Sequence, residues 1–358
     1  MRQEIQGDVL PVTARAAVDL SVVCPFFNEE KFIGESVRLL LRKLEELDAT
    51  WELIVVDDGS VDRSRELAIE AGAGHPRLRV LGYRFNRGRG HALRTGIAQA
   101  RGEIIVTTEI DLSWGEDIVE RLYDAIRARP DVDIVVASPH LPGGGYKNVP
   151  ANRVFFSRFG NQVIRACVGN TVSMNTGMTR AYRREVIRSL PLEEDRKEFH
   201  LEVVLKANAF NYRFHEIPAV LEWKAAKFDG RELERKSSSK VNRLVLTHSL
   251  FSLFANPVRY VWRLSGASAL LSLASLVAGI VRLALGLVSV YMLIISLAFA
   301  IISVMLFGFG VIAQQGNMVQ TELWRLQKDL LRLTPPDPAQ RDDLHPPSRS
   351  SRSERDAG

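Results

Sequence analysis

Hydrophobic and polar positions alternate along residues 20–138 with two different periods. Short apolar runs rich in β-branched residues are separated by segments with a helical pattern. The predicted strands are Leu20–Pro25, Leu53–Asp57, Arg79–Tyr83, Ile104–Thr108 and Ile134–Ser138. The predicted helices are Glu30–Leu47, Asp62–Ala71, His91–Ala100 and Asp117–Arg129. Strands that alternate with helices in this way predict an α/β domain, in which helices cover both faces of a mostly parallel sheet.

Leu264–Ala313 has a different pattern, because these 50 residues contain one charged residue, Arg282. A membrane core about 30 Å thick is crossed by about 20 apolar helical residues. The segment therefore predicts two membrane spans, Val261–Val281 and Val288–Ala313, with Arg282 and Gly286 at the turn between them. The alternative is a buried helical hairpin of a soluble protein, but soluble helices rarely lack a polar face over such a length.

Charge is concentrated next to this apolar segment. The chain has 47 Lys and Arg against 42 Asp and Glu, a net charge of +5, whereas Lys224–Arg263 alone carries nine basic and three acidic residues. The positive-inside rule then predicts that the α/β domain and both termini lie in the cytoplasm. The basic segment is expected to meet anionic lipid headgroups of the bilayer. Nucleic-acid binding is not expected, because this segment leads directly into a membrane anchor.

Composition excludes several other classes of protein. With 46% hydrophobic and 25% charged residues, the chain is neither collagen-like nor wholly disordered. Two cysteines, Cys24 and Cys167, cannot form a disulfide framework, and no Cys/His spacing indicates a zinc site. The first 20 residues contain no apolar segment, so no cleavable signal peptide is expected.

Polar side chains follow three of the predicted strands, at the edge where parallel sheets bind ligands. These are Asn28-Glu29, Asp57-Asp58 and the pair Glu109 and Asp111. Glu109 and Asp111 are two residues apart, so in an extended chain they share a face and could hold one divalent cation. By itself, Asp57-Asp58 followed by Gly and Ser is equally typical of a turn that caps a helix. No P-loop or complete dinucleotide-binding fingerprint occurs.

Several segments together resemble the GT-A domain of family 2 glycosyltransferases. They are, in order, CPFFNEE, VVDDGSVD and NRGRGHALRTGIAQARGEIIVTTEIDLSWGED. The later segments GGGYKNVPANRVFFSRFGNQVIR, NTGMTRAYRREVI and FNYRFHEIPAVLEW, followed by the hydrophobic hairpin, are similar to the polyprenyl-phosphate glycosyltransferases, the group that contains dolichol-phosphate mannosyltransferase. The resemblance covers about residues 20–326. No QxxRW follows, which argues against a processive polysaccharide synthase.

This resemblance implies a GT-A fold, followed by an interfacial helix at Val241–Phe254 and a two-helix transmembrane hairpin. The chain is then expected to have six parts: a flexible N-terminus (1–18), a GT-A domain (19–225), basic juxtamembrane helices (226–260), two transmembrane helices (261–313), a cytoplasmic helix (314–333) and a disordered tail (334–358).

The resemblance also implies a reaction, the inverting transfer of one sugar from a UDP- or GDP-sugar to polyprenyl phosphate. Because the acceptor phosphate is already anionic, the reaction needs no strongly shifted general base. It needs neutralisation of the departing nucleoside diphosphate and in-line positioning. Mg²⁺ or Mn²⁺ held by Glu109 and Asp111 would supply this neutralisation.

Individual roles are carried over from matching motif positions. Binding of the donor nucleotide is expected from Pro25, Asn28, Glu29, Asp57, Asp58 and Glu109. Binding of the acceptor phosphate is expected from Arg153, Ser157 and His140. Asp111 and Arg153 are the residues expected to be catalytic. Glu202, on the predicted helix Glu198–Ala209, matches an acidic position near the acceptor in relatives, but a solvent-facing side chain is the commoner case on a helix and is expected here.

The chain departs from the family pattern at four positions. Glu109 replaces the usual Asp, Ser113 replaces Gln, His140 stands near a missing Arg, and Ser173 replaces an acidic residue. Two other functions therefore stay open: a GT-A enzyme acting on another membrane lipid, such as a glycerolipid, and a non-catalytic scaffold. The donor sugar and the length of the lipid are not specified by the sequence, and homo-oligomer formation is also left open.

Overall fold

The computed structural model describes residues 18–168, 172–223, 226–228, 231–233, 257–287 and 290–333. The predicted interfacial helix at Val241–Phe254 lies outside the described residues. The predicted tail, 334–358, and nearly all of the predicted flexible N-terminus also lie outside them.

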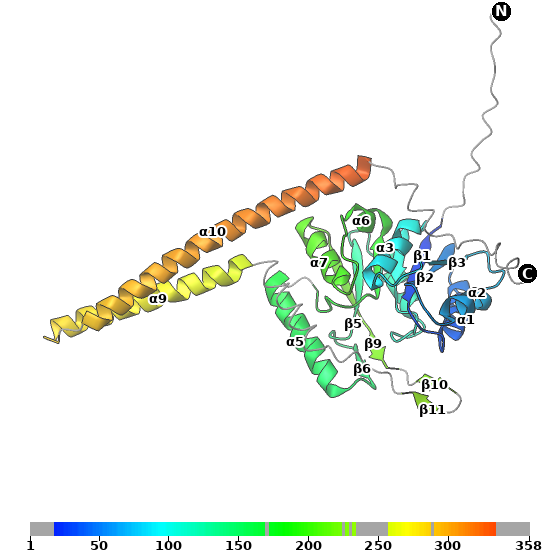
Figure 1. Cartoon of the computed structure of the whole chain (residues 1–358), viewed down its shortest axis with the longest axis horizontal. Coiled ribbons are helices and arrows are strands. Elements are labelled where there is room, and N and C mark those ends of the chain that lie inside the picture. The colour runs from blue at the N-terminus through cyan, green and yellow to red at the C-terminus, as the bar shows by residue number, and fades with distance from the viewer. Residues whose placement is uncertain are drawn as a thin grey trace, which may run out of the picture.

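A seven-stranded sheet forms the centre of the N-terminal domain, in the order β3-β2-β1-β4-β7-β5-β8 (Figure 1). Its strands are β1 (Leu20–Phe26), β2 (Trp51–Asp57), β3 (Leu78–Gly82), β4 (Ile104–Thr107), β5 (Ile134–Ser138), β7 (Arg180–Arg183) and β8 (Phe214–Pro218). β7 is antiparallel to β4 and β5, and the other neighbours are parallel. The predicted mostly parallel α/β fold is confirmed.

Helices and two small ribbons complete the described chain. The helices are α1 (Ile33–Glu45), α2 (Ser64–Ala71), α3 (Arg89–Gln99), α4 (Ile118–Arg127), α5 (Ala151–Val168), α6 (Arg184–Ser189), α7 (Phe199–Ala209), α9 (Pro257–Ala284) and α10 (Val290–Leu333). The ribbons pair β6 (Gly145–Lys147) with β9 (Val220–Glu222), and β10 (Ala226–Phe228) with β11 (Arg231–Leu233). The β6–β9 ribbon lies near the start of α5 (Figure 1).

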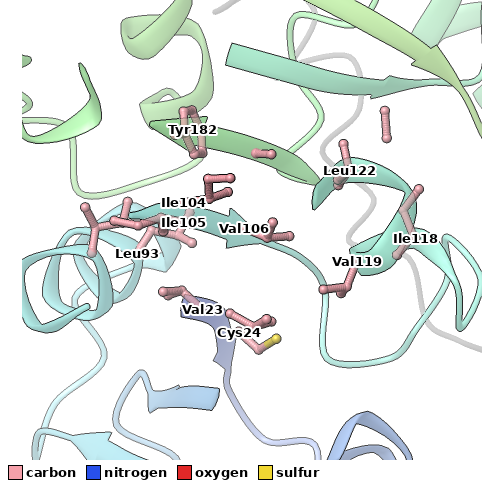
Figure 2. Packing of buried hydrophobic residues seen from close by; sticks show 14 of the residues in the cluster. Val23, Cys24, Leu93, Ile104, Ile105, Val106, Ile118, Val119, Leu122 and Tyr182 are labelled. Atoms are coloured by element: carbon pink, nitrogen blue, oxygen red, sulfur yellow. The ribbon is translucent and has the colours of Figure 1, made fainter. Parts of the chain in front are cut away.

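The core lies between the sheet and the helices that cover it. Every residue of β1 and β2 is buried, which is why these strands read as continuous apolar runs. Figure 2 shows Leu93 of α3 and Ile118 and Leu122 of α4 among the buried side chains around β1 and β4. α3 packs very closely against β1, since a Cβ at Gly96 would lie 2.4 Å from Val23 Cγ1.

α9 and α10 form a long antiparallel hairpin that projects away from the sheet (Figure 1). Val261–Ala284 and Val290–Leu330 are long and apolar enough to cross a membrane, and little of either segment is buried. The chain reverses at Gly286, where φ is +75°. Hydroxyl groups join the two helices: Ser268 Oγ donates to Phe299 O at 2.8 Å and Ser272 Oγ to Ser296 O at 2.8 Å. These two helices are candidate membrane spans.

α10 does not end at the predicted limit of the second span. It continues without a break to Leu333, so the segment 314–333 is part of the same 44-residue helix. At 1.5 Å per residue this helix is about 66 Å long, roughly twice the thickness of a membrane core. Its C-terminal half therefore extends well beyond any bilayer that its first half crosses.

Candidate active site

The loops after β1 and β2 hold each other through side-chain hydrogen bonds. Asn28 has a φ of +54°; its backbone N–H donates to Ser60 Oγ at 3.0 Å, and its Oδ1 accepts from Val61 N at 3.0 Å. Glu29 N donates to Ser64 Oγ at 2.7 Å. Pro25 is the penultimate residue of β1 and lies in register with Val56 of β2. The structure thus brings the predicted donor-site residues of both strands together.

Asp58 fixes the segment that follows β3. Its Oδ1 accepts from Tyr83 Oη at 2.6 Å, from Arg87 N at 3.0 Å and from Gly88 N at 3.0 Å, and its Oδ2 accepts from Asn86 Nδ2 at 3.0 Å. The side chain is buried. Asp58 therefore sets the position of the 83–88 segment, whatever else it binds.

Asp57 is buried beside it and accepts a hydrogen bond from Ser60 N at 2.9 Å. Burial raises the pKa of this carboxyl above its ordinary value, although the Ser60 bonds and the charge of Arg65 oppose that effect. A buried carboxylate with a raised pKa gains most from a ligand that donates hydrogen bonds, such as a ribose or a base.

Glu109 and Asp111 lie on one tight turn after β4, residues 109–113, here called the acidic turn. Ser113 joins them, because its Oγ donates to Glu109 Oε2 at 2.7 Å and its N donates to Asp111 Oδ1 at 3.0 Å. The pKa of the Cys24 thiol, on β1, is raised mainly by burial. The negative charge of Asp111 raises it further, so Asp111 lies close to the end of β1. Ser113, which replaces the usual Gln, thus orders both carboxylates.

A divalent cation fits this turn in part. Among the described residues, no three His, Cys, Asp or Glu side chains are grouped as metal ligands. Two carboxylates with only oxygen donors nevertheless suit Mg²⁺ or Mn²⁺, which commonly take one or two carboxylates and complete their shell with phosphate oxygens and water. The residues present therefore fit a cation that binds together with a diphosphate.

The candidate acceptor residues meet around Tyr146, which the sequence did not single out. Tyr146 Oη lies 2.9 Å from Ser157 Oγ and 3.4 Å from His140 Nε2. Burial lowers the pKa of His140, and the positive charges of Arg158 and Arg165 lower it further. Ser157 and His140 are thus brought together, as expected, with a phenol hydroxyl between them.

Arg153 has a different neighbour on the first turn of α5. Its guanidinium carbon lies 4.7 Å from the ring centroid of Trp223, just after β9. Stacking of this kind restrains an arginine while leaving its planar fork able to bind a phosphate. Trp223 therefore supports Arg153 at the candidate acceptor site.

Lys197 links the two candidate sites electrostatically. Burial lowers the pKa of its ammonium group, and the positive charges of Arg89 and Arg153 lower it further. Arg89 Nη1 in turn lies 3.6 Å from Glu109 Oε1. Lys197 is therefore close enough to Arg89 and to Arg153 for their charges to repel its own, and an anion bound nearby would relieve this repulsion.

The β6–β9 ribbon joins the acidic turn to the acceptor side. Glu222 N donates to Ser113 O at 2.7 Å, and the Glu222 carboxylate lies 3.0 Å from Lys147 Nζ. Trp223 N then donates to Lys147 O at 3.0 Å. The acidic turn and the Arg153–Trp223 stack thus share one supporting ribbon.

Two other residues singled out in the sequence have structural contacts. Ser173 Oγ donates to Glu216 Oε1 at 2.7 Å, so β8 supplies a carboxylate beside the position where relatives carry an acidic residue. Glu202 is buried rather than solvent-facing, and its Oε1 lies 2.6 Å from Lys206 Nζ. The expectation of an exposed Glu202 is wrong, because Lys206, one helical turn away, compensates its charge inside the domain.

Comparison with known proteins identifies related enzymes. Residues 21–190 match the family model described as Glycosyl transferase family 2. The polyprenol monophosphomannose synthase of Mycolicibacterium smegmatis is 30% identical over 215 residues, which cover 58% of this chain and 79% of that enzyme. The undecaprenyl-phosphate 4-deoxy-4-formamido-L-arabinose transferase of Pectobacterium carotovorum is 28% identical over 201 residues, 56% of this chain and 58% of that enzyme.

Other similarities are more distant. Glycosyltransferase AglD of Haloferax volcanii is 27% identical over 277 residues, 76% of this chain and 42% of that protein. The chain thus spans less than two thirds of the length of AglD and of the arabinose transferase. Among solved structures, glucosyl-3-phosphoglycerate synthase from Mycobacterium tuberculosis, crystallised with Mn²⁺ and UDP-glucose, has a TM-score of 0.48 and 21% identity, covering 66% of this chain and 80% of that one.

Proposed function

The chain belongs to glycosyl transferase family 2, and we propose that it transfers one sugar, with inversion, from a UDP- or GDP-sugar to polyprenyl phosphate. The observation that carries the proposal is a basic side chain at each candidate site: Arg89 lies 3.6 Å from Glu109 on the acidic turn, and Arg153 stacks on Trp223 at the start of α5. A diphosphate leaving group and a phosphate nucleophile are both anionic, and these two cations would neutralise them.

Each group of residues then has a role in the transfer. Pro25, Asn28, Glu29, Asp57 and Asp58 would hold the base and ribose of the donor at the ends of β1 and β2. Glu109 and Asp111 would hold Mg²⁺ or Mn²⁺, which supplies Lewis-acid stabilisation of the departing diphosphate when bound. Asp111 acts at the reacting diphosphate and is the residue on which we expect transfer to depend most.

The acceptor phosphate would bind between Arg153 and the Ser157–Tyr146–His140 group. An arginine fork binds phosphate oxygens in pairs, and hydroxyl groups add directional hydrogen bonds. A phosphate oxygen held there is already a nucleophile, so it can attack the anomeric carbon without losing a proton. Positioning and charge neutralisation are then sufficient, and no general base is assigned.

The membrane hairpin supports a lipid acceptor. By the positive-inside rule, its basic flanks favour a cytoplasmic catalytic domain and cytoplasmic termini, on the side where a polyprenyl phosphate would expose its headgroup. The arabinose transferase and the mannose synthase named above carry undecaprenyl phosphate or polyprenol in their names. The region that matches the family model, residues 21–190, includes the donor-site strands.

Acceptor discrimination tests this proposal. Detergent-solubilised full-length protein would be incubated with a panel of UDP- and GDP-sugars, Mn²⁺ and one of three acceptors: polyprenyl phosphate, polyprenol or diacylglycerol. We expect transfer to polyprenyl phosphate only, and a large loss of it in Arg153→Ala. Transfer to an alcohol acceptor that is insensitive to Arg153→Ala would instead assign a different lipid substrate.

A further inference from the structure

The C-terminal turns of α10 lie against the catalytic domain, beside α6 (Figure 1). Lys328 Nζ donates to Tyr212 Oη at 2.8 Å and lies 4.6 Å from the centroid of the Phe210 ring. Gln327 Nε2 donates to Glu193 Oε1 at 3.3 Å. The same helix that forms the second candidate span therefore contacts both the end of α7 and the segment that follows α6.

Trp324 of α10 covers a buried ion pair. Lys206 Nζ lies 5.3 Å from the centroid of the Trp324 ring and 2.6 Å from Glu202 Oε1, and it also donates to Pro191 O. The Glu202 carboxylate accepts both backbone N–H groups of residues 193–194, at 3.0 to 3.2 Å. Because a buried ion pair is stable only when its hydrogen bonds are satisfied, this pair fixes the path of the 191–194 backbone.

The same segment supports the first turn of α3. His91 N donates to Asp195 O at 3.0 Å, and the Asp195 carboxylate also accepts from Arg94. The two backbones are in direct contact: a Cβ at Gly88 would lie 2.4 Å from Asp195 O, and one at Gly90 would lie 2.5 Å from Glu194 O. A displacement of residues 191–198 would therefore displace the start of α3.

Two basic residues of the candidate donor site stand on these two segments. Lys197 belongs to the 191–198 segment, and Arg89, which lies 3.6 Å from Glu109, belongs to the first turn of α3. A continuous set of contacts thus leads from α10 through the Glu202–Lys206 pair to the acidic turn.

We propose that Trp324, Gln327 and Lys328 of α10 are positioning residues for the donor site. They hold residues 191–198 against the start of α3. Arg89 then stays beside the acidic turn, which would bind the diphosphate, and Lys197 stays near Arg89. The inference rests on the proposed function for the assignment of this turn to the donor diphosphate. Trp324 lies 11 residues beyond the predicted end of the second span, or about 17 Å along the helix. Anchoring in the membrane and order at the donor site therefore depend on one helix.

Hydrogen exchange on the full-length protein in detergent tests the contact. In the triple variant Trp324→Ala/Gln327→Ala/Lys328→Ala we expect the amides of His91, Glu193 and Glu194 to exchange about 10-fold faster, because three aromatic–cation contacts and two hydrogen bonds are lost. Amides of β1 and β2 should not change. The matched control is Glu322→Ala/Arg325→Ala, which removes an exposed ion pair from the same helical turns. Unchanged exchange at His91 in the triple variant would overturn the proposal.

Nucleotide binding separates positioning from general stabilisation. The triple variant should bind UDP or GDP with Mn²⁺ about 10-fold more weakly, while its KM for polyprenyl phosphate stays within about twofold of that of the wild type. Trp324→Phe/Lys328→Arg, which keeps a ring and a cation in place, should restore binding. Equal weakening for both substrates, or no rescue, would contradict a positioning role. If no transfer to polyprenyl phosphate occurs in the wild type, the proposed function fails, but the exchange result still decides the contact.

Discussion

His140 stands near the position at which the family pattern has an arginine, and Tyr146 lies beside it. His140 and Ser157 were identified from sequence because they lie at motif positions, and the structure joins them through Tyr146. Tyr146 follows three consecutive glycines, and nothing in the sequence around it indicates a binding role. Its role depends on the β6–β9 pairing, which brings residues 145–147 beside a strand more than 70 residues away.

Removal of the Tyr146 hydroxyl should weaken acceptor binding specifically. In Tyr146→Phe we expect the KM for polyprenyl phosphate to rise about 10-fold, which corresponds to the loss of one or two hydrogen bonds near a charged group. The KM for the nucleotide sugar should not change, since the hydrogen-bond partners described for Tyr146, His140 and Ser157, both belong to the candidate acceptor site. Tyr291→Phe, at an exposed position on α10, is the control. An unchanged acceptor KM would remove Tyr146 from the site.

The half-buried imidazole of His140 should make the domain less stable in mild acid. Because burial and the nearby arginines lower its pKa, the unfolded chain binds a proton before the folded one does. The stabilising contribution is therefore complete above the unfolded pKa of about 6.5 and decreases as the pH falls below it.

Thermal unfolding between pH 7.5 and 5.5 measures this effect. The Tm should fall as the pH falls, and His140→Asn should reduce that fall. The pKa values of His91 and His215 are also lowered, so both histidines contribute to the fall in Tm. The difference between the wild type and His140→Asn isolates the contribution of His140. Identical pH dependence in both proteins would show that His140 does not contribute.

At the scale of helices and strands, the sequence predicted the elements that have strong periodicity. All five predicted strands formed. Four of them, β1, β2, β4 and β5, are buried at every position, whereas β3 is only partly buried. β7 was missed because its four residues, RAYR, are polar at both ends. It is held in place by β4 and β5 on either side, and Arg180 is buried in the process. Such a strand is specified by its neighbours, which a local pattern does not contain.

Glycine spacing in the hairpin offers a test of how the two long helices pack. A Cβ at Gly310 would lie 2.1 Å from the Trp262 indole, whereas a Cβ at Gly308 would meet nothing within 4 Å. Gly310→Val should therefore destabilise the hairpin by about 1–3 kcal/mol relative to Gly308→Val. Both variants carry the same change in helix propensity, so the difference in Tm in detergent isolates the contact. Equal Tm values would mean that the indole does not pack there.

At the scale of the whole molecule, the sequence placed the catalytic and membrane parts but not their connection. The spans were recognised from apolar length alone. The docking of α10 on the catalytic domain depends on Trp324, Gln327 and Lys328, whose partners are 116 to 134 residues away for the two hydrogen bonds. Long-range contacts of this kind leave no periodic signal. They explain how a helix that contains a candidate membrane span also contacts the catalytic domain at α6 and at the end of α7.

The mass of the lipid product tests the central claim most directly. Full-length protein would be incubated with polyprenyl phosphate, Mn²⁺ and the donor panel, and the lipids would be analysed by mass spectrometry beside an Asp111→Asn sample. The account predicts one new lipid, heavier than the acceptor by a single glycosyl residue, that is absent with Asp111→Asn. A product that persists at the wild-type level in that variant, or nucleotide binding without any lipid product, would contradict it.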